Sequence, residues 1–467
     1  MRYVSTRGEA SALGFRDVVL AGLARDGGLY LPESWPQLTH GEIAGLAGRP
    51  YAEVAFKIIS RFVGDEIPAL ALRKMLDEAY ATFRHDAVAP LAQIGPNHFL
   101  LELFHGPTLA FKDLPMQFLA RLMDHVLAER DERATIVGAT SGDTGGAAIE
   151  AFRGRERIDI AILFPDGRVS PVQRRQMTTA RERNVQAIAI EGTFDDTQAL
   201  VKAMFNDSRF RERVRLSGVN SINWGRIVAQ IVYYFTAAVS LGAPHRPVSF
   251  TVPTGNFGNI FAGYAAKRMG LPIERLIIAT NVNDILHRTL QTGRYDVRSV
   301  VPTSSPSMDI QVSSNFERLL FEAEGRDPDK VRRLMAGLGQ SGAYTLSPKV
   351  RGTLVTDFAS GATDEAQTLA TIARLRRDDG ILVDPHTAVG VAVAERHLGA
   401  TPMVTMATAH PAKFPDAVEA ACGERPELPE WARSILSAEE IYRVVPADLG
   451  AVEQAVEARL RTHETVG

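Results

Sequence analysis

Short apolar segments alternate with helix-like segments along most of this chain, and this alternation limits the folds that it can form. The apolar segments cover residues 98–103, 134–140, 158–164, 185–190, 247–253, 275–280 and 402–408. Continuous apolar strands that are separated by helices are typical of a parallel sheet buried on both faces. Open parallel sheets bind their ligands at the carboxyl ends of the strands. The sequence therefore predicts an α/β fold, with candidate sites at the turns that follow these segments.

Two regions fall outside this alternation. Residues 52–63 and 67–83 carry the apolar spacing of helices, so the chain up to about residue 90 is expected to be mainly helical. Pro90 and the pair Gly95-Pro96 mark the boundary after which strands begin. Residues 283–380 are expected to be helical and rich in loops, without a definite order of elements.

The composition excludes several classes of protein. The chain has 467 residues, a net charge of -3 and 45% hydrophobic residues, which allows two or three domains and gives no basis for binding nucleic acid. The single cysteine, Cys422, rules out an internal disulfide framework and fits a reducing compartment. The sequence shows no apolar run of membrane-helix length, no signal-peptide pattern and no metal-binding motif. We therefore expect a cytoplasmic protein without a membrane partner or a metal centre.

The first candidate site is the turn at 254–259, between the strand segment 247–253 and a helix. It consists of Thr254, Gly255, Asn256, Phe257, Gly258 and Asn259. Glycines let successive N–H groups converge, and a helix N-terminus behind them favours an anion. No Lys-Ser or Lys-Thr pair follows, and the glycine spacing does not match the dinucleotide fingerprint. The pattern fits a phosphate monoester bound without a metal, and an ordinary strand-to-helix connection stays open as the alternative.

A second glycine-rich turn follows the strand segment 134–140. Its first residues are Thr140, Ser141, Gly142, Asp143 and Thr144. The hydroxyl groups and the exposed amides of such a turn can bind a carboxylate or a phosphate of a substrate. The alternative is that Ser141 or Asp143 only caps the helix that follows. Two turns of this kind in one chain favour one ligand phosphate and one substrate anion.

Lys112 lies in an apolar stretch just before a helix. Apolar residues recur every four positions from Leu114 to Val126, which predicts a helix from about residue 113 with Asp113 as its cap. The positive end of the helix dipole and the apolar neighbours would both lower the pKa of Lys112. A neutral amine is a nucleophile that can form a Schiff base with an aldehyde. The alternative is a lysine whose stem covers apolar surface while its ammonium group stays in water.

Two further segments place polar groups at the ends of elements. Ser221, Asn223 and Arg226 lie at the start of an apolar helix, where Arg226 is a candidate phosphate ligand. A capped helix with an exposed arginine is the alternative there. Thr408 is the first polar residue after a strand that ends near Ala407. Its neutral hydroxyl can bond a heteroaromatic ring nitrogen without protonating it, unless Thr408 merely ends the strand.

Together these residues resemble the threonine synthase family, over nearly the whole chain and in the family's order. The stretches YVSTRG and GLARDGGLYLP are similar to the start of that family. The matching motifs further along are FHGPTLAFKD (104–113), TSGDTGGAA (140–148), NSINWGR (220–226), PTGNFGN (253–259), VDPHTAVG (383–390) and TAHPAKF (408–414). One glycine-rich turn is a weak signal, but this ordered set is specific.

The resemblance implies a fold type II pyridoxal-phosphate enzyme, similar to the tryptophan synthase β family. That fold has two open, mostly parallel sheets flanked by helices. The implied domains are a mainly helical N-terminal domain at 1–90, a smaller α/β domain for cofactor and substrate at 91–240, and a larger α/β domain with the phosphate-binding loop at 241–467. The implied reaction is the last step of threonine biosynthesis, in which O-phospho-L-homoserine and water give L-threonine and phosphate. The sequence leaves monomer and homodimer open.

The resemblance also implies residue roles. Lys112 would hold pyridoxal 5'-phosphate as a Schiff base, the turn at 255–259 would hold the cofactor phosphate, and Thr408 would bond the pyridine nitrogen. The turn at 140–144 would receive the substrate carboxylate. One subgroup of the family has Asn at position 143, so the contact of Asp143 with the cofactor ring stays open. The remaining substrate-binding residues would be Thr144, Ser221, Asn223, Arg226 and Asn259, most of them at the substrate phosphate.

Other functions remain compatible with the same residues. A related phospho-lyase would release 2-oxobutyrate, phosphate and ammonia from O-phosphohomoserine. A serine or threonine dehydratase is disfavoured, because Arg226 and its neighbours favour a phosphorylated substrate. A non-catalytic sensor of a phosphate ligand on the same fold is the alternative from a different class of protein.

Overall fold

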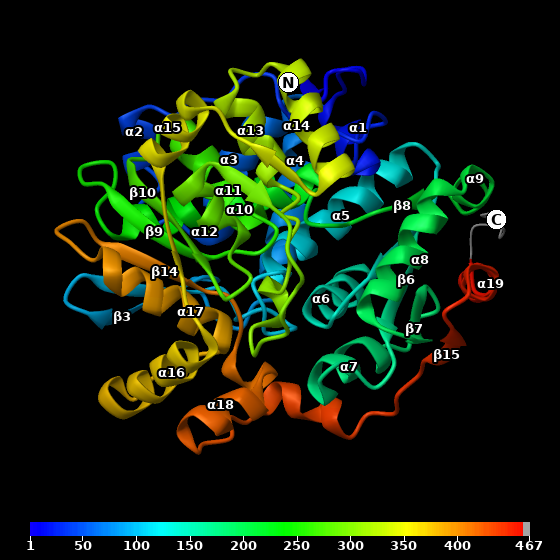
Figure 1. Cartoon of the computed structure of the whole chain (residues 1–467). Coiled ribbons are helices and arrows are strands. Elements are labelled where there is room, and N and C mark those ends of the chain that lie inside the picture. Colours follow the sequence, from blue (N-terminus) through cyan, green and yellow to red (C-terminus); the bar gives the residue numbers. More distant parts are fainter. Residues whose placement is uncertain (461–467) are drawn as a thin grey trace.

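The structure is a computed structural model that describes residues 1–460. Two sheets with mostly parallel strands lie at its centre, and helices cover both faces of each (Figure 1). This agrees with the predicted fold class. The end of the expected third domain, residues 461–467, lies outside the described residues.

The larger sheet has six strands in the order β13-β10-β9-β14-β4-β3. All neighbouring strands are parallel except the antiparallel pair β3 and β4. Its two faces are both buried: Leu276 of β10 lies in the main core, whereas the next residue, Ile277, packs with Val389 of the helix α17 (Pro385–Ala394). The strands are β3 (Leu91–Gly95), β4 (His98–Glu102), β9 (Val248–Pro253), β10 (Ile273–Thr280), β13 (Phe358–Ala362) and β14 (Met403–Ala407).

The smaller sheet has five strands in the order β15-β7-β6-β5-β8, and all of them are parallel. Ile162 of β6 faces the main core, and its neighbour Leu163 packs with Leu200 of the helix α8 (Phe194–Asn206) in a second core. The strands are β5 (Ala134–Ala139), β6 (Ile158–Pro165), β7 (Val185–Glu191), β8 (Leu216–Ser217) and β15 (Arg443–Pro446).

The N-terminal region packs on the start of a long helix, α10 (Trp224–Ser240). The rings of Tyr3, Trp35 and Phe62 surround Trp224 at centroid distances of 5.8, 6.2 and 5.8 Å. This aromatic packing fixes the end of α10 that carries the candidate Arg226. The region contains the antiparallel pair β1 (Tyr3–Ser5) and β2 (Tyr30–Pro32) and the helices α1 (Phe15–Ala21), α2 (His40–Ala44), α3 (Tyr51–Val63) and α4 (Ala69–Tyr80).

The other elements cover the two sheets or connect them. The helices that follow are α5 (Asp113–Glu129), α6 (Asp143–Phe152), α7 (Pro171–Thr178), α8 (Phe194–Asn206), α9 (Ser208–Val214), α11 (Gly258–Arg268), α12 (Ile285–Thr292), α13 (Phe316–Ala323), α14 (Pro328–Ser341), α15 (Pro348–Asp357), α16 (Glu365–Asp379), α17 (Pro385–Ala394), α18 (Pro415–Cys422) and α19 (Leu449–Glu457). A small pair of strands is formed by β11 (Arg294–Asp296) and β12 (Ala343–Thr345), and the short 3-10 helices are η1 (Pro306–Met308), η2 (Glu395–His397), η3 (Pro411–Lys413) and η4 (Glu430–Leu436).

Every apolar segment predicted as a strand forms one, but four strands of the two central sheets were not predicted. These are β3, β8, β13 and β15, which all lie at the edges of the two sheets. Edge strands are less buried than central ones, and β3 has no fully buried residue. Their sequences, LAQIG, LS, FASGA and RVVP, therefore lack the continuous apolar run of the central strands.

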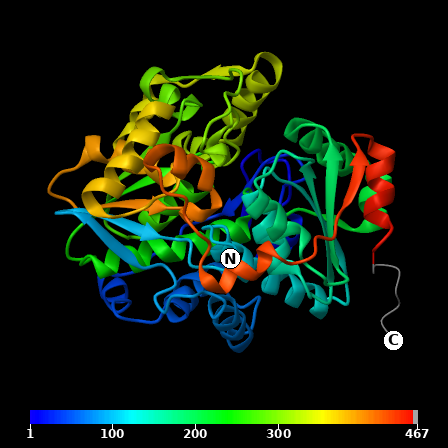
Figure 2. The same ribbon diagram turned by 90° about the horizontal axis from the view of Figure 1, so that it is seen from below.

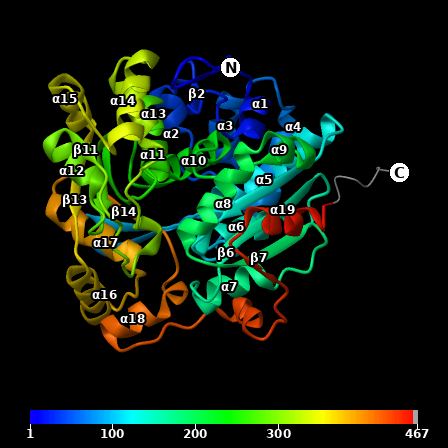
Figure 3. The same ribbon diagram turned by 45° about the vertical axis from the view of Figure 1, so that its right-hand side comes forward.

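The sheets do not follow the expected division of the chain at 90/91 and 240/241. Strands β3 and β4 belong to the larger sheet, although they lie in the segment expected to form the smaller domain. Strand β15 pairs with β7 in the smaller sheet, although it comes near the end of the chain. Figure 2 shows this red strand beside the teal strands, and Figure 3 shows α19 next to β7 and α8. The chain thus crosses between the two sheets more than once.

Within residues 1–460, no helix is both long and apolar enough to cross a membrane.

Candidate active site

Lys112 lies at the carboxyl end of the larger sheet, directly before α5. The N–H of Phe111 donates to the carbonyl oxygen of Thr408, just after β14, and this bond holds the lysine at the strand end. The side chain of Lys112 is buried, and its Nζ lies 3.4 Å from Oδ2 of Asp143 and 3.4 Å from Oγ of Ser307. Burial lowers the pKa of Lys112, although the nearby Asp143 opposes this shift. A lysine with its ammonium in water is therefore excluded.

Asp113 does not cap α5, which corrects the prediction for this residue. The residue at the cap position is Lys112, and no side chain caps the helix there. The carboxylate of Asp113 instead accepts hydrogen bonds from the N–H and the hydroxyl of Thr108, at 2.8 and 2.6 Å. Burial raises the pKa of Asp113 to about 6 against the lowering effect of these bonds. Asp113 therefore fixes the loop that leads into Lys112.

The turn at 140–144 connects β5 to α6 and places Asp143 beside Lys112. The hydroxyl oxygen of Thr140 accepts hydrogen bonds from the N–H groups of Gly142 and Gly145, at 2.9 and 3.0 Å. No side chain caps α6, so neither Ser141 nor Asp143 has the capping role that was the alternative. Ser141 and Thr144 are half-buried at the same turn.

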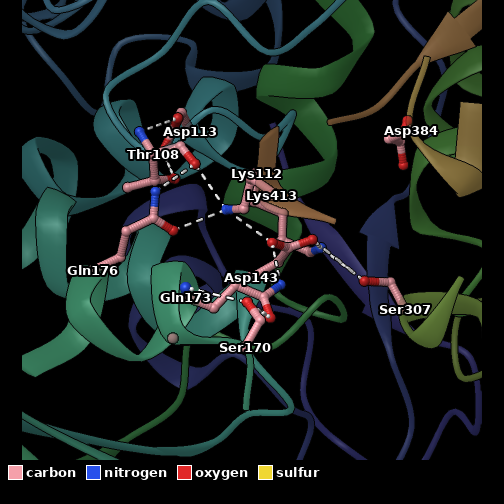
Figure 4. Close-up of polar contacts among 12 residues, drawn as sticks. Thr108, Lys112, Asp113, Asp143, Ser170, Gln173, Gln176, Ser307, Asp384 and Lys413 are labelled. Atoms are coloured by element: carbon pink, nitrogen blue, oxygen red, sulfur yellow. Dashed lines mark hydrogen bonds and ion pairs between the residues drawn. The ribbon is translucent and has the colours of Figure 1, made fainter. Parts of the chain in front are cut away.

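Asp143 lies at the centre of a buried polar cluster (Figure 4). Its Oδ1 is 2.8 Å from Nζ of Lys413 and accepts a bond of 2.9 Å from the amide of Gln173. Its Oδ2 faces Lys112 and Ser307. Burial alone would raise the pKa of Asp143, but Lys413 and Lys112 hold it well below its usual range. The cluster therefore contains a permanent carboxylate next to the amine of Lys112.

The turn at 254–259 follows β9 and ends in the first residue pair of α11. Phe257 adopts the left-handed conformation with φ 63 at the start of the helix. A Cβ atom on Gly255 would lie 2.8 Å from the carbonyl oxygen of Ser307, so the two backbones need the glycine to approach this closely. Since the hydroxyl of the same Ser307 faces Lys112, the turn and the lysine lie on either side of one residue.

Asn315 connects this turn to the segment before α10. Its amide group donates to the carbonyl oxygens of Asn256 and Ser221, at 2.9 and 3.2 Å. Its own oxygen accepts a bond from Arg318, which also donates to the carbonyl oxygen of Ile222. The two candidate phosphate-binding segments are thus held at a fixed separation by one side chain.

Arg226 is buried in the first turn of α10, so the alternative of an exposed arginine is wrong. One guanidinium nitrogen donates to the carbonyl oxygen of Val219 at 3.1 Å, and its Nε has no hydrogen-bond partner. Burial lowers the pKa of Arg226 to about 10. No Asp or Glu among residues 1–460 forms an ion pair with this guanidinium. A buried cation without a carboxylate partner is costly unless it meets an anion, so the site fits an anionic ligand.

Asn223 and Asn259 differ in what their side chains do. Asn223 caps α10 through the N–H of Gly225 and donates to the carbonyl oxygen of Val19 at 2.8 Å, so both ends of its amide hold the protein together. Asn223 therefore has the structural role that was its alternative, and its assignment to the substrate is corrected. The oxygen of Asn259 accepts bonds from Tyr233 and Tyr234, while its buried Nδ2 has no partner. That free donor fits an anion acceptor.

Sequence reasoning missed several residues of this site. Ser307 and Asn315 lie in the loop-rich part of the chain, where no periodic pattern marks single positions. Gln173 of α7 lies outside all the motifs described above. Lys413 lies in the motif TAHPAKF, but no role was predicted for it. His386 and Asp384, from VDPHTAVG, form a bond of 2.7 Å, and His386 accepts the N–H of Ser307 at 3.1 Å.

The residues fit pyridoxal phosphate by their chemistry. A buried amine with a lowered pKa, Lys112, suits attachment of an aldehyde. The glycine turn at 255–259 offers backbone N–H groups and a helix N-terminus to a phosphate. Thr408 lies beside Phe111 at a strand end, and its neutral hydroxyl suits a hydrogen bond with a ring nitrogen. Within residues 1–460, no group of three His, Cys, Asp or Glu side chains is arranged to hold a metal ion.

Family models match nearly the whole chain. The model described as "Threonine synthase N terminus" matches residues 2–80, "Pyridoxal-phosphate dependent enzyme" matches 85–408, and "Threonine synthase, C-terminal" matches 387–456. A threonine synthase of Pseudomonas aeruginosa is 54% identical over 459 residues, which cover 98% of each chain.

Two solved structures are similar along their whole length. A crystal structure of threonine synthase with bound pyridoxal phosphate, from Brucella melitensis, has a TM-score of 0.97 and 62% identity and covers 99% of this chain and 100% of that chain. The threonine synthase of yeast has a TM-score of 0.93 and 38% identity, with 98% of each chain covered.

Proposed function

This chain belongs to the threonine synthase family, and on that basis we propose that its substrate is O-phospho-L-homoserine and that the groups around Lys112 act on it. It is a pyridoxal-phosphate-dependent lyase, as the resemblance implied. The observation that carries the substrate assignment is the buried, unpaired Arg226. A dehydratase acting on an unphosphorylated amino acid has no use for this cation.

The cofactor would be held at three points of this chain. Lys112 would carry it covalently, the N–H groups of the turn at 255–259 would bind its phosphate, and Thr408 would donate or accept at the pyridine nitrogen. Bound pyridoxal phosphate supplies an electron sink for bonds at the substrate amino acid. A neutral hydroxyl at the ring nitrogen leaves that nitrogen without a full positive charge.

Arg226 would bind the phosphate of the substrate together with Asn259, Thr144 and Ser221. The free Nε of Arg226 and the free Nδ2 of Asn259 both lack a partner in the protein. Tyr233 connects the two, because it bonds the oxygen of Asn259 and lies close enough to Arg226 to interact electrostatically. An arginine fork and an amide donor together suit the oxygens of a phosphate monoester that later leaves.

The substrate carboxylate would lie at the turn 140–144. Its amide and hydroxyl groups, including those of Ser141, are positioned by Thr140, whose oxygen organises the turn. With phosphate and carboxylate fixed at two points, the α and β carbons of the substrate would lie near Nζ of Lys112. The amine is buried and has a lowered pKa, so it can take up and return a proton at these carbons. Water added at the β carbon then gives threonine.

Product analysis tests the reaction. Purified protein with added pyridoxal phosphate is expected to convert O-phospho-L-homoserine to L-threonine and phosphate. Formation of 2-oxobutyrate and ammonia instead would show the phospho-lyase reaction and contradict the proposal. Lys112→Ala is expected to reduce turnover by at least about 1000-fold, since it removes both the attachment point and the proton carrier. Lys74→Ala, at a lysine with a side chain 76% exposed, serves as the matched control and should leave turnover unchanged.

Attachment at Lys112 is tested separately. Reduction of the holoenzyme with borohydride, followed by peptide mass spectrometry, should place the cofactor on the peptide that contains Lys112. A label on any other lysine would refute this assignment.

We also propose that the protein acts in the cytoplasm. Its one cysteine, Cys422, is free, which suits a reducing compartment. Cell fractionation tests this placement, and size-exclusion chromatography with light scattering separates monomer from homodimer.

A further inference from the structure

Lys413 is a second buried lysine beside Lys112, and none of the roles above uses it. Its side chain is fully buried in η3, just after β14. Its Nζ donates to the carbonyl oxygen of Thr108 at 2.7 Å and to Oε1 of Gln176 at 3.0 Å, and lies 2.8 Å from Oδ1 of Asp143. Figure 4 shows these three groups converging on its nitrogen.

These contacts identify Lys413 as an ammonium group. A protonated amine has three N–H donors, and three oxygen acceptors surround this one. Thr108 and Gln176 are also bonded to each other, so the two neutral acceptors are themselves fixed. Burying a charge is costly unless it is paired and fully hydrogen-bonded, and Lys413 meets both conditions through Asp143.

The two oxygens of Asp143 have different partners. Oδ1 is taken by Lys413 and by the amide of Gln173, whereas Oδ2 is turned toward Lys112 and Ser307. Lys112 cannot serve as a lasting counter-ion, because in the proposed function its nitrogen is bonded to the cofactor for part of each turnover. Lys413 is the other ammonium within bonding distance of this carboxylate.

We propose that Lys413 is a positioning residue, which keeps the Asp143 carboxylate charged and oriented beside Lys112 throughout the reaction. This inference rests on the attachment of the cofactor at Lys112 that is proposed above. A carboxylate that is buried at this position needs a lasting cation, and Lys413 supplies it.

The charged groups that face this pair come from several elements. Lys112, Lys413 and His386 lower the pKa of Asp143, and Arg226 contributes to lowering the pKa of Lys112. The charge of Lys413 also opposes the effect of burial, which raises the pKa of Asp113 at the start of α5. The neutral groups around Asp143 are Gln173 and Ser307. Removal of Lys413 therefore leaves Asp143 with Lys112 as its one directly bonded cation among the described residues.

The test is a pH titration of the absorbance of the bound cofactor, in the absence of substrate. In Lys413→Met, the unpaired carboxylate should favour a proton on the nitrogen of Lys112, so the apparent pKa of the absorbance change should rise by about one unit or more. The double variant Lys413→Met with Asp143→Asn removes both charges and should bring the apparent pKa back toward that of Asp143→Asn alone. Because no substrate is present, this result does not depend on whether O-phosphohomoserine is the substrate.

Three results would overturn the proposal. One is a titration of Lys413→Met that matches the unchanged protein while the cofactor stays bound. Another is a shift of equal size in the Asp143→Asn background, which would mean that Lys413 acts without Asp143. If Lys413→Met does not fold, recovery of folded, cofactor-bound protein in the double variant supports the pairing. Failure of the double variant as well would be the third contrary result, since it would show that the site needs Lys413 for packing alone.

Discussion

The two glycine-rich turns of the site occupy equivalent places in the two sheets but have different surroundings. Each follows a parallel strand, β5 or β9, and begins a helix. The turn at 140–144 carries Asp143 and lies among the buried charges of Lys112 and Lys413. The turn at 254–259 contains no titratable residue, and the groups that bond it, on Ser313, Asn315 and two tyrosines, are neutral.

The difference shows two ways to prepare a site for an anion. Backbone amides at a helix N-terminus need only the right geometry. They do not titrate, so their ability to bind an anion does not change with pH. Buried side-chain charges act more strongly but must be balanced against one another. In the proposed assignment, the neutral turn holds the cofactor phosphate, which stays bound from one turnover to the next. The charged region faces the bonds that break and form.

Among the changes that test this comparison, the largest effect should come from removing the buried cation that has no carboxylate partner. Arg226→Gln is expected to lower kcat/KM for O-phosphohomoserine about 100-fold, because a charge-assisted bond to the phosphate contributes about 1.5–3 kcal/mol and a second donor is lost with it. Arg226→Lys keeps the charge without the fork of donors, so its kcat/KM should lie between the values of the unchanged protein and of Arg226→Gln. Affinity for pyridoxal phosphate, measured by titration of the apoenzyme, should remain as it was. A parallel loss of cofactor affinity would contradict the assignment of the cofactor phosphate to the neutral turn and of the substrate phosphate to Arg226.

A change at Gly255 tests the neutral turn by its geometry. Gly255→Ala places a Cβ atom 2.8 Å from the carbonyl oxygen of Ser307, whereas in Gly258→Ala the nearest atom, Nδ2 of Asn315, is 3.3 Å away. Overpacking costs about 1–3 kcal/mol, so Gly255→Ala should weaken cofactor binding about 30-fold. Gly258→Ala should weaken it less, since the amide of Asn315 can shift. Equal affinities in the two variants would contradict the close approach of Ser307.

Asn315 tests whether the two phosphate-binding segments depend on each other. Asn315→Asp keeps an acceptor for Arg318 and removes the amide that donates to Asn256 and Ser221. The loss should weaken cofactor binding about tenfold, because unsatisfied buried carbonyl groups cost about 1–3 kcal/mol. KM for the substrate should rise as well, since Ser221 is released at the same time. If only one of the two constants changes, the segments are independent.

The smallest effect concerns the pH dependence of stability at His410, which lies close to Lys413 on the charged side of the site. Burial lowers the pKa of His410 to about 4, and its Nδ1 accepts the N–H of Ala412, which requires an unprotonated nitrogen. A histidine whose pKa is lower in the folded protein stabilises the fold fully above its ordinary pKa near 6.5. That contribution is lost as the pH falls toward 4, and at pH 5.5 it has decreased by about 1 kcal/mol. The free energy of unfolding, measured with denaturant, should therefore fall more steeply between pH 7.5 and 5.5 in the unchanged protein than in His410→Asn.

The central strands and the residues at their ends were predictable because parallel sheets leave a strong signal. Strands such as β6 are buried on both faces and read as unbroken apolar runs. Lys112 and Thr408 each follow such a strand directly or within a short loop, so the fold brings them together without any further information. Edge strand β13 is half-buried and lacked that signal.

The interior of the site was less predictable, because it depends on burial and on partners far apart in sequence. The burial of Arg226 follows from the packing of the N-terminal region around Trp224, and no local pattern shows this. Asn223 has the same residue type as a ligand but serves as a helix cap. Lys413 and Asp143 are separated by most of the chain, and their pairing appears once the two sheets are assembled.

The pairing of β15 with β7 has a consequence for protein synthesis. Residues 443–446 leave the ribosome after every other strand of the two sheets, so until then the outer edge of β7 has no strand partner. An open strand edge can pair with another chain and lead to aggregation. The smaller sheet is therefore complete only when residues 443–446 have emerged, and a nascent chain that stops before them would present that edge to its surroundings.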